Sequence, residues 1–269
     1  MALSEINDTG LVLVGCGKMG SALLQGWLAN GLAPASVWVL DPAPSDWLRG
    51  LAGVHLNEAL PPAPKVAVIA VKPQMMGQAL PGLRALPGAT LILSIAAGTP
   101  VSAFDTALGA GRPIVRAMPN TPAAIGQGIS ALVGNPAAQP QLDLAQALMA
   151  AVGATVRLDS EDQMDAVTAV SGSGPAYVFH LIETLAAAGT AQGLPADLAL
   201  QLARATVAGA GALAAADATD PAQLRVNVTS PGGTTQAALG VLMDPATGFR
   251  PLLGRAVAAA AQRSRELRA

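Results

Sequence analysis

The first half of the chain alternates short apolar runs with longer stretches whose apolar residues recur at helical spacing. Several of the short runs are apolar at every position, which is typical of parallel strands covered by helices on both faces. Helical stretches such as Met19–Asn30 and Met75–Ala85 lie between them. This alternation predicts an α/β, doubly wound parallel sheet. Its expected strands are Leu11–Val14, Val37–Leu40, Val66–Val71, Leu91–Ile95, Ile114–Arg116 and Ile129–Val133.

The pattern changes near residue 158, beyond which only alanine-rich helical periodicity remains. Pro175, Pro195 and Pro221 each fall where a first helical turn tolerates proline. We therefore expect two domains, residues 1–158 (α/β) and residues 159–269 (all α). The expected helices of the second domain are Ser160–Val170, Pro175–Gln192, Pro195–Ala216, Ala222–Val228, Thr234–Met243 and Gly248–Glu266.

Composition narrows the class of protein. Hydrophobic residues make up 52% of the chain, 58 of the 269 residues are alanine, and 12% are charged. The charged share is about half the usual ~25%, so much of the surface is expected to face another subunit. Net charge is −2 without a basic cluster, which argues against nucleic-acid binding.

The sequence also limits the expected cellular location and the expected metal sites. The longest continuous apolar runs are of strand length, and the N-terminal ten residues lack the features of a secretory signal. We expect a cytoplasmic protein without a membrane partner. A single cysteine excludes a disulfide framework and a thiolate metal cage, and no metal site is expected.

A glycine-rich turn between the first strand and the first long helix carries the clearest motif. It fits G-x-G-x-x-G, the dinucleotide-binding fingerprint: one glycine permits the tight turn, one admits the pyrophosphate, and one lets helix pack on sheet. The helix N-terminus adds amide donors for phosphate. The residues are Gly15, Cys16, Gly17, Lys18, Met19 and Gly20.

Asp41 lies 21 residues beyond Gly20, at the end of the second strand. A carboxylate there would accept hydrogen bonds from a ribose 2′-hydroxyl and repel a 2′-phosphate. We therefore expect good use of NADH, although Arg49 would partly compensate for NADPH. The alternative is an exposed aspartate that merely opens the turn before Pro42.

Two later strand ends should line the nicotinamide side of the same crevice, because ligands of doubly wound sheets bind beyond the carboxyl ends of strands. The stiff segment Arg116–Pro122 follows the next strand. Each segment alone is compatible with an ordinary connection, but together they favour a cleft. The two strand ends are Ala70, Val71, Lys72 and Pro73, and Ser94, Ile95, Ala96, Ala97 and Gly98.

The helical half holds two polar interruptions. Ser171–Pro175 is either a ligand-lining pivot or a helix kink. The segment Asn227–Thr235 contains Pro-Gly-Gly-Thr-Thr at a helix start, where Gly232, Gly233 and the hydroxyls of Ser230, Thr234 and Thr235 suit a carboxylate; simple helix capping is the alternative.

The small numbers of histidines and lysines limit the reaction mechanisms that the chain can support. The histidines are His55 and His180, and the lysines are Lys18, Lys65 and Lys72, all in the first third. A His–Asp proton relay and lysine-dependent dehydrogenation are therefore poorly supported. Hydride addition to an already protonated C=N bond fits better.

These residues closely resemble the pyrroline-5-carboxylate reductase family over nearly the whole chain. Besides the segments above, the resemblance rests on Asp165–Tyr177 and Leu224–Leu239. It implies a Rossmann domain, a helical domain that forms an interleaved homodimer (a decamer in many members), and NADPH- or NADH-dependent reduction of L-1-pyrroline-5-carboxylate to L-proline.

The resemblance also implies individual roles. Ser230 and the amides of Gly233 and Thr234 would hold the substrate carboxylate, and Thr235 would hydrogen-bond the ring nitrogen. Glu161, Asn227 and Val228 would line the substrate pocket. Asn57 and the two strand-end segments would contact the cofactor.

One departure concerns Asp41, where many members carry a small polar residue, so strict NADPH preference is in doubt. Two rival functions remain open: a reductase of a related substrate such as piperideine-2-carboxylate, and a dinucleotide-sensing regulator. The Ser230–Thr235 loop argues against a regulator, which needs no carboxylate site.

Overall fold

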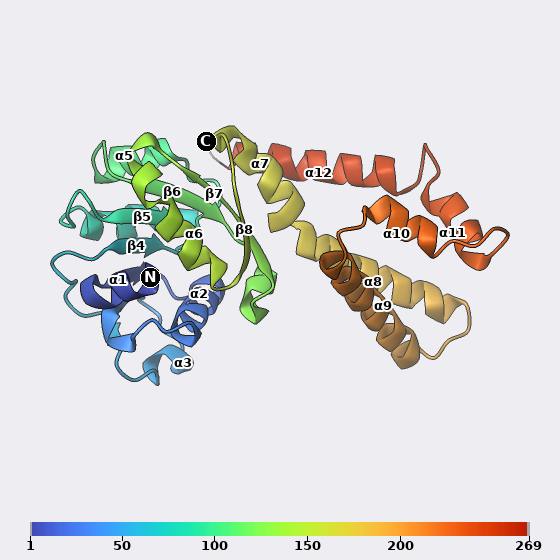
Figure 1. The fold of residues 1–269 in the computed structure, drawn as a ribbon, viewed down its shortest axis with the longest axis horizontal. Coiled ribbons are helices and arrows are strands. Elements are labelled where there is room, and N and C mark those ends of the chain that lie inside the picture. The colour runs from blue at the N-terminus through green and yellow to red at the C-terminus, as the bar shows by residue number, and fades with distance from the viewer. Residues whose placement is uncertain (1, 268–269) are drawn as a thin grey trace. The chain divides into compact units, whose positions relative to one another are not determined.

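The strands of the first half form one eight-stranded sheet in the computed structural model, which describes residues 2–267. The strand order is β3-β2-β1-β4-β5-β6-β7-β8 (Figure 1). In register, Leu11 of β1 lies beside Val37 of β2 on one side and Val66 of β4 on the other. The strands are β1 (Leu11–Val14), β2 (Val37–Leu40), β3 (His55–Leu56), β4 (Val66–Ile69), β5 (Leu91–Ser94), β6 (Ile114–Met118), β7 (Gly128–Gly134) and β8 (Gly153–Arg157).

Alternate residues of each strand point into two separate hydrophobic layers. Leu11 and Leu13 pack under α1 (Ala2–Thr9), α2 (Lys18–Ala29) and α6 (Leu142–Ala150). Val12 and Val14 pack on the opposite face under α4 (Met76–Ala79) and α5 (Val101–Leu108). A short helix, α3 (Asp46–Arg49), buries Leu48 in the first layer. The predicted Rossmann-type sheet with helices on both faces is therefore confirmed.

The sheet departs from the prediction in three places. β7 runs antiparallel to β6, because residues 119–127 are too short to carry a parallel crossover. β3 and β8 were not predicted: β3 has two residues, and the outer strand β8 is largely exposed. The helix expected over Met75–Ala85 is broken into α4 and flanking 3₁₀ turns, since two glycines and a proline interrupt it.

Residues 2–172 and 261–267 form one compact unit, and residues 173–260 form a second. The first unit therefore extends past the expected boundary at 158/159. It includes a 3₁₀ turn (Glu161–Gln163), α7 (Met164–Val167) and a π-helical turn (Thr168–Gly172). A buried hydrogen bond of 2.7 Å, from the Ser264 hydroxyl to Asp165, ties the C-terminal residues to α7.

The second unit is entirely helical among its described residues. Asp220 caps α10 by accepting from the Ala222 amide at 2.7 Å. Gly193 (φ +96°) ends α8, and a Cβ at Gly189 would lie 3.3 Å from Ala199, so the α8–α9 hairpin packs closely. The helices are α8 (Gly174–Ala191), α9 (Ala196–Ala216), α10 (Pro221–Asn227), α11 (Thr234–Leu242) and α12 (Phe249–Glu266), whose end belongs to the first unit.

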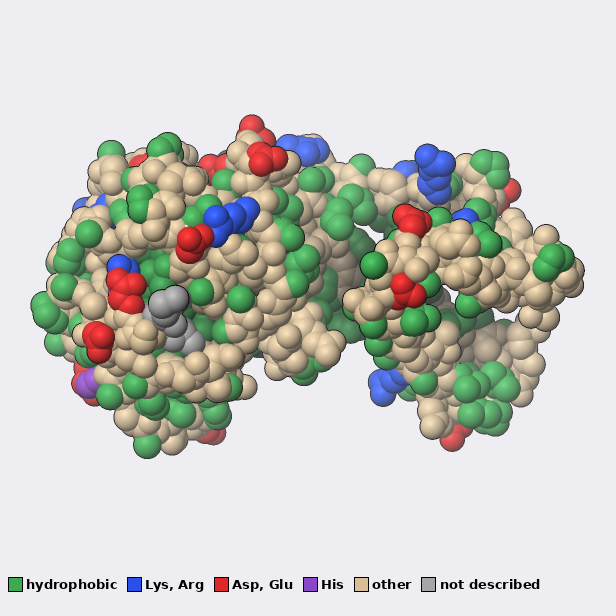
Figure 2. Space-filling model, viewed as in Figure 1, with side chains coloured by type: hydrophobic (Ala, Val, Ile, Leu, Met, Phe, Trp, Pro, Cys, Tyr) green, Lys and Arg blue, Asp and Glu red, His purple; other side chains and the backbone are tan. Residues whose placement is uncertain are grey.

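This unit buries very little of its own apolar surface. Its buried hydrophobic side chains are Ala199 and Ala203, whereas Phe179 is 62% exposed and Leu202 48% exposed. Figure 2 shows hydrophobic side chains (green) on the surface of this unit. By length and composition α9 alone among the described helices is apolar enough to cross a membrane, although continuous apolar runs had suggested no such helix.

Candidate active site

The glycine-rich turn fits a dinucleotide phosphate. A Cβ at Gly15 (φ +87°) would lie 2.8 Å from Val71, and one at Gly20 would lie 2.4 Å from the Gly15 carbonyl oxygen. A Cβ at Gly17 would meet nothing within 4 Å, so the turn is open on that side. The amides of Gly17, Lys18 and Met19 have no acceptor among the described residues. The turn is therefore closed toward the protein and open, with free donors, toward a ligand.

Asp41 is fixed beside this turn at the end of β2. Its Oδ2 accepts from the Cys16 amide at 2.7 Å, and its Oδ1 accepts from the Ala43 amide at 2.8 Å. Asn57 (φ +55°) holds the Asp41 backbone, accepting from its amide at 2.9 Å and donating to its carbonyl at 2.8 Å. The Arg49 Nε instead donates to the Pro44 carbonyl at 3.1 Å. The carboxylate is thus oriented by backbone amides, and no described ion pair includes it.

The thiol of Cys16 is buried inside the turn. Burial raises its pKa to about 11, and the neighbouring Asp41 charge contributes in the same direction. The thiol is therefore protonated at neutral pH and packs as a small hydrophobic group.

Three of the predicted segments meet at one cleft of about 420 Å³ in the first unit. They come from the turn after β1 and from the ends of β4 and β5. The cleft is also lined by Met118–Thr121, from the expected segment Arg116–Pro122, and by Gly172, from the polar interruption Ser171–Pro175. Two of the three lysines lie in it, with no acid. The lining residues are Gly17, Lys18, Met19, Ala70, Val71, Lys72, Pro73, Ile95, Ala96, Ala97, Met118, Pro119, Asn120, Thr121 and Gly172.

The predicted cofactor residues outside this lining support it from behind. Ser94 is 1% exposed, and its hydroxyl accepts from the Ala96 amide at 3.2 Å. Gly15, Cys16 and Gly20 are buried under the turn. They shape the cleft but do not face it.

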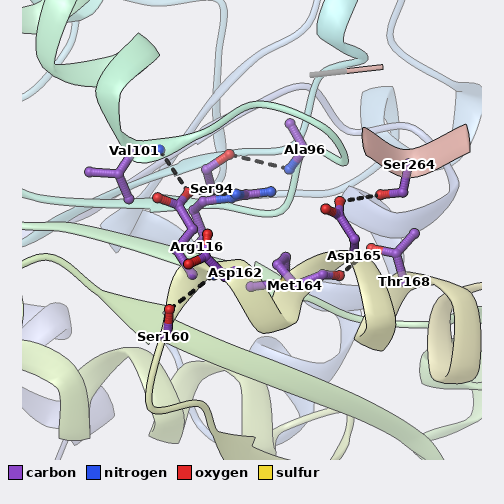
Figure 3. A network of polar contacts seen from close by, with 11 residues as sticks. Ser94, Ala96, Val101, Arg116, Ser160, Asp162, Met164, Asp165, Thr168 and Ser264 are labelled. Atoms are coloured by element: carbon purple, nitrogen blue, oxygen red, sulfur yellow. Dashed lines mark hydrogen bonds and ion pairs between the residues drawn. The ribbon is translucent and has the colours of Figure 1, made fainter. Parts of the chain in front are cut away.

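Glu161 lies in the first unit, on the far side of the β5–α5 loop. Its Oε1 accepts from the Val101 amide at 2.9 Å and from the Arg116 guanidinium at 2.5 Å. Arg116 is 4% exposed, on β6 next to Ser94. Figure 3 shows this network beside the loop from Ser94 to Val101. A single carboxylate therefore joins α5, β6 and the start of α7 behind the loop that carries Ile95–Ala97.

The predicted substrate loop lies in the second unit, before α11. The Gly232 amide donates to Gln236 Oε1 at 2.5 Å, and the Gly233 amide donates to the Ser230 carbonyl at 3.1 Å. A Cβ at Gly233 would lie 2.4 Å from the Ser230 hydroxyl. The amides of Thr234 and Thr235, in the first turn of α11, have no acceptor among the described residues. Of the two amides expected to hold the carboxylate, that of Thr234 is free and that of Gly233 is engaged within the loop.

The neighbouring residues of α10 are less constrained. Asn227 accepts from the Gln223 side chain at 2.8 Å, and Val228 is 65% exposed.

No group of three or more potential metal ligands occurs among residues 2–267. His55 is engaged by Glu58 at 2.8 Å and by the Ala35 carbonyl at 3.2 Å, away from the cleft lining.

Comparisons with known proteins agree with this geometry. Residues 161–267 match the family described as Pyrroline-5-carboxylate reductase dimerisation, and residues 10–98 match NADP oxidoreductase coenzyme F420-dependent. A curated pyrroline-5-carboxylate reductase of Pseudomonas aeruginosa is 41% identical over 265 residues, covering 96% of both chains.

Solved structures give the same result. A pyrroline-5-carboxylate reductase of Coxiella burnetii matches with a TM-score of 0.88 and 34% identity, covering 96% of this chain and 98% of the other. The pyrroline carboxylate reductase of Plasmodium falciparum, solved with NADP bound, matches with a TM-score of 0.82 and 27% identity, covering 98% and 99%. The chain described here belongs to the pyrroline-5-carboxylate reductase family.

Proposed function

We propose that this chain catalyses the NAD(P)H-dependent reduction of L-1-pyrroline-5-carboxylate to L-proline, the final step of proline biosynthesis. The observation that carries the proposal is the match along 96% of the chain to curated reductases of that name. The cleft of the first unit and the Ser230–Thr235 loop supply the two kinds of site that such a reaction needs.

The first unit would hold the cofactor. The free amides of Gly17, Lys18 and Met19 would donate to its pyrophosphate, and Lys18 would add a positive charge. A nicotinamide dinucleotide bound there supplies the hydride that reduces C5 of the ring. Ile95–Ala97 and Met118–Thr121 form the wall of the cleft beyond the glycine turn.

The second unit would hold the substrate. Ser230 and the first-turn amides of α11 bind the carboxylate, with Gly232 and Gly233 giving the loop its close turn and Asn227 and Val228 bordering the pocket. The Thr235 hydroxyl bonds the ring nitrogen and orients its proton. Because an imine nitrogen is readily protonated, positioning and charge complementarity suffice without a strong acid.

Thr235→Ala tests this assignment. We expect kcat/KM to fall about 10–10³-fold, the range for loss of a positioned donor, with an unchanged melting temperature. Thr229→Ala is the control, because that hydroxyl donates to the Arg225 carbonyl of α10 at 2.6 Å. Wild-type turnover by Thr235→Ala would remove Thr235 from the mechanism.

The activity itself is tested by following NADH and NADPH oxidation with pyrroline-5-carboxylate and with piperideine-2-carboxylate. Faster turnover of the five-membered ring supports the proposal, and faster turnover of the six-membered ring selects the related reductase. Tight cofactor binding without turnover of either substrate selects a regulator.

We further propose that NADH is used well, and better than NADPH. Asp41 supports this preference, because its carboxylate is fixed beside the glycine-rich turn, where it would accept from a ribose 2′-hydroxyl and repel a 2′-phosphate. In Asp41→Ser we expect the ratio of kcat/KM for NADH over NADPH to fall about tenfold or more, equivalent to about 1.4 kcal/mol. Asp46→Ser, in the first turn of α3, is the matched control. An unchanged ratio would refute the role of Asp41.

The assembly we propose is a cytoplasmic, interleaved homodimer, with a decamer as the higher state. The dimerisation family match and the poorly buried helices support self-association. On this interpretation a second copy covers the apolar side of α9. The functional division we propose assigns residues 1–158 to the cofactor and residues 159–269 to the substrate and dimerisation, with Gly172 reaching the cofactor cleft from the second part.

A further inference from the structure

We propose that Asn120 is a positioning residue: it fixes the wall of the cofactor cleft by satisfying a backbone carbonyl that Pro175 leaves without a donor. The inference rests on the proposed function, in which this cleft holds the dinucleotide. The sequence placed Asn120 within the expected cleft segment Arg116–Pro122 but gave it no role of its own.

The carbonyl in question belongs to Ser171, in the π-helical turn Thr168–Gly172. In an α-helix this carbonyl would accept from the amide of residue 175, four positions later. Residue 175 is proline, which has no amide hydrogen. The Ala176 amide, one residue further on, donates to the Ser173 carbonyl at 3.0 Å. The chain therefore needs an external donor at Ser171.

Asn120 supplies that donor. Its Nδ2 donates to the Ser171 carbonyl at 3.1 Å, and its Oδ1 accepts from the Ile129 amide at 2.9 Å, at the start of β7. Asparagine at the start of a helical turn usually caps that turn, yet this side chain makes no capping bond to Thr121–Ile125. Both ends of the amide group bind the protein, so Asn120 links the π-helical turn to the start of β7.

The neighbours of this side chain form the cleft. Met118, Asn120, Thr121 and Gly172 all line it. A Cβ at Gly172 would lie 2.7 Å from Met118 Cε, so the π-helical turn and the end of β6 touch without spare room. Loss of the Asn120 bond would let Ser171 and Gly172 shift against Met118 and thus move the cleft wall.

Asn120→Asp separates the two hydrogen bonds. The carboxylate still accepts from Ile129 but sets an oxygen against the Ser171 carbonyl. We expect kcat to fall about 10–100-fold, because a displacement near 1 Å in a reacting pair has that effect. We expect NADH, titrated by fluorescence, to bind about tenfold more weakly. Asn120→Ser, which lacks the repulsion, gives the same direction if the aspartate variant does not fold.

The rescue experiment is specific to the mechanism. Pro175→Ala supplies an amide at the position that an α-helix would use for the Ser171 carbonyl. The double variant Asn120→Ser/Pro175→Ala, which carries no opposing carboxylate, should therefore recover part of the lost NADH affinity and turnover. Pro175→Ala alone should behave as wild type. Unchanged NADH binding in both Asn120 variants, or an equal defect with and without Pro175→Ala, would overturn the proposal. If the wild-type chain reduces no pyrroline-5-carboxylate, the proposed function fails, but the NADH titrations still decide the role of Asn120.

Discussion

The two units of the chain differ most in what they bury. The first unit, here called the sheet unit, encloses two layers of large side chains, including Trp27 and Phe104, both 0% exposed. The second unit is called the helical unit. The helical unit buries Ala199 and Ala203 and leaves Phe179 on its surface. Both are rich in apolar residues, so hydrophobic content alone does not decide whether a segment has its own core. The helical unit has elements without a complete core, which is the condition of a chain that packs with a second copy.

The largest effect should come from a charge on the unpartnered helical surface. Phe179, Leu200 and Arg204 line a groove of about 520 Å³ between α8 and α9. In Phe179→Glu a buried charge opposes association by several kcal/mol, so we expect monomers by light scattering and at least about 100-fold lower activity. The sheet unit should remain folded, with Cys16 protected from alkylation.

Val156→Glu is the matched control for this variant. Val156 is 42% exposed on the outer strand β8 of the sheet unit, so the same change should leave mass and activity near wild type. If the Phe179→Glu protein is dimeric and active, the apolar surface of the helical unit does not pack against a second copy.

A second test examines the sheet unit from within. Glu161→Gln leaves the buried Arg116 charge unpaired, and we expect a loss of about 3 kcal/mol in the free energy of unfolding by urea. Asp143→Asn removes the partner of Arg157 on the surface, where Asp143 is 92% exposed, and should cost less than about 0.5 kcal/mol. Equal losses in the two variants would show that the Arg116 pair is no more important than a surface pair.

The smallest effect concerns Cys16. The folded state raises the pKa of its thiol from 9.0 to about 11, so the unfolded chain loses this proton first as pH rises. Stability contributed by the buried thiol is present below pH 9 and is lost as pH rises toward 11. We expect the urea midpoint of the wild type to fall more between pH 8 and 10.5 than that of Cys16→Ala. Parallel pH dependence of the two proteins would disprove the contribution.

Local pattern was enough to predict much of this structure. Continuous apolar runs marked β1, β2, β4 and β5, and proline positions marked the starts of α8–α10, because these signals lie in adjacent residues. β3 and β8 were missed because two residues, or a half-exposed strand ending in Thr155–Arg157, carry no apolar run. The antiparallel direction of β7 follows from the short connection formed by residues 119–127. The hydrophobic pattern of the strands does not predict strand direction.

The site was predictable only where a motif is contiguous. The glycine turn and the Ser230–Thr235 loop were visible in the sequence. The Arg116–Glu161 pair spans 45 residues and the Asn120–Ser171 bond spans 51, so only folding brings them together. A buried arginine in a predicted strand was the one available signal, since such a charge requires a partner.

The placement of the lysines has a practical consequence for chemical modification. Two of the three lysines, Lys18 and Lys72, are exposed in the cofactor cleft, and Lys65 is engaged by Glu5. A lysine-selective reagent used to attach a dye or to immobilise the protein therefore reacts chiefly at the mouth of the cleft. For this chain, lysine modification is chiefly a label of the cofactor cleft, and protection by bound dinucleotide is its natural assay.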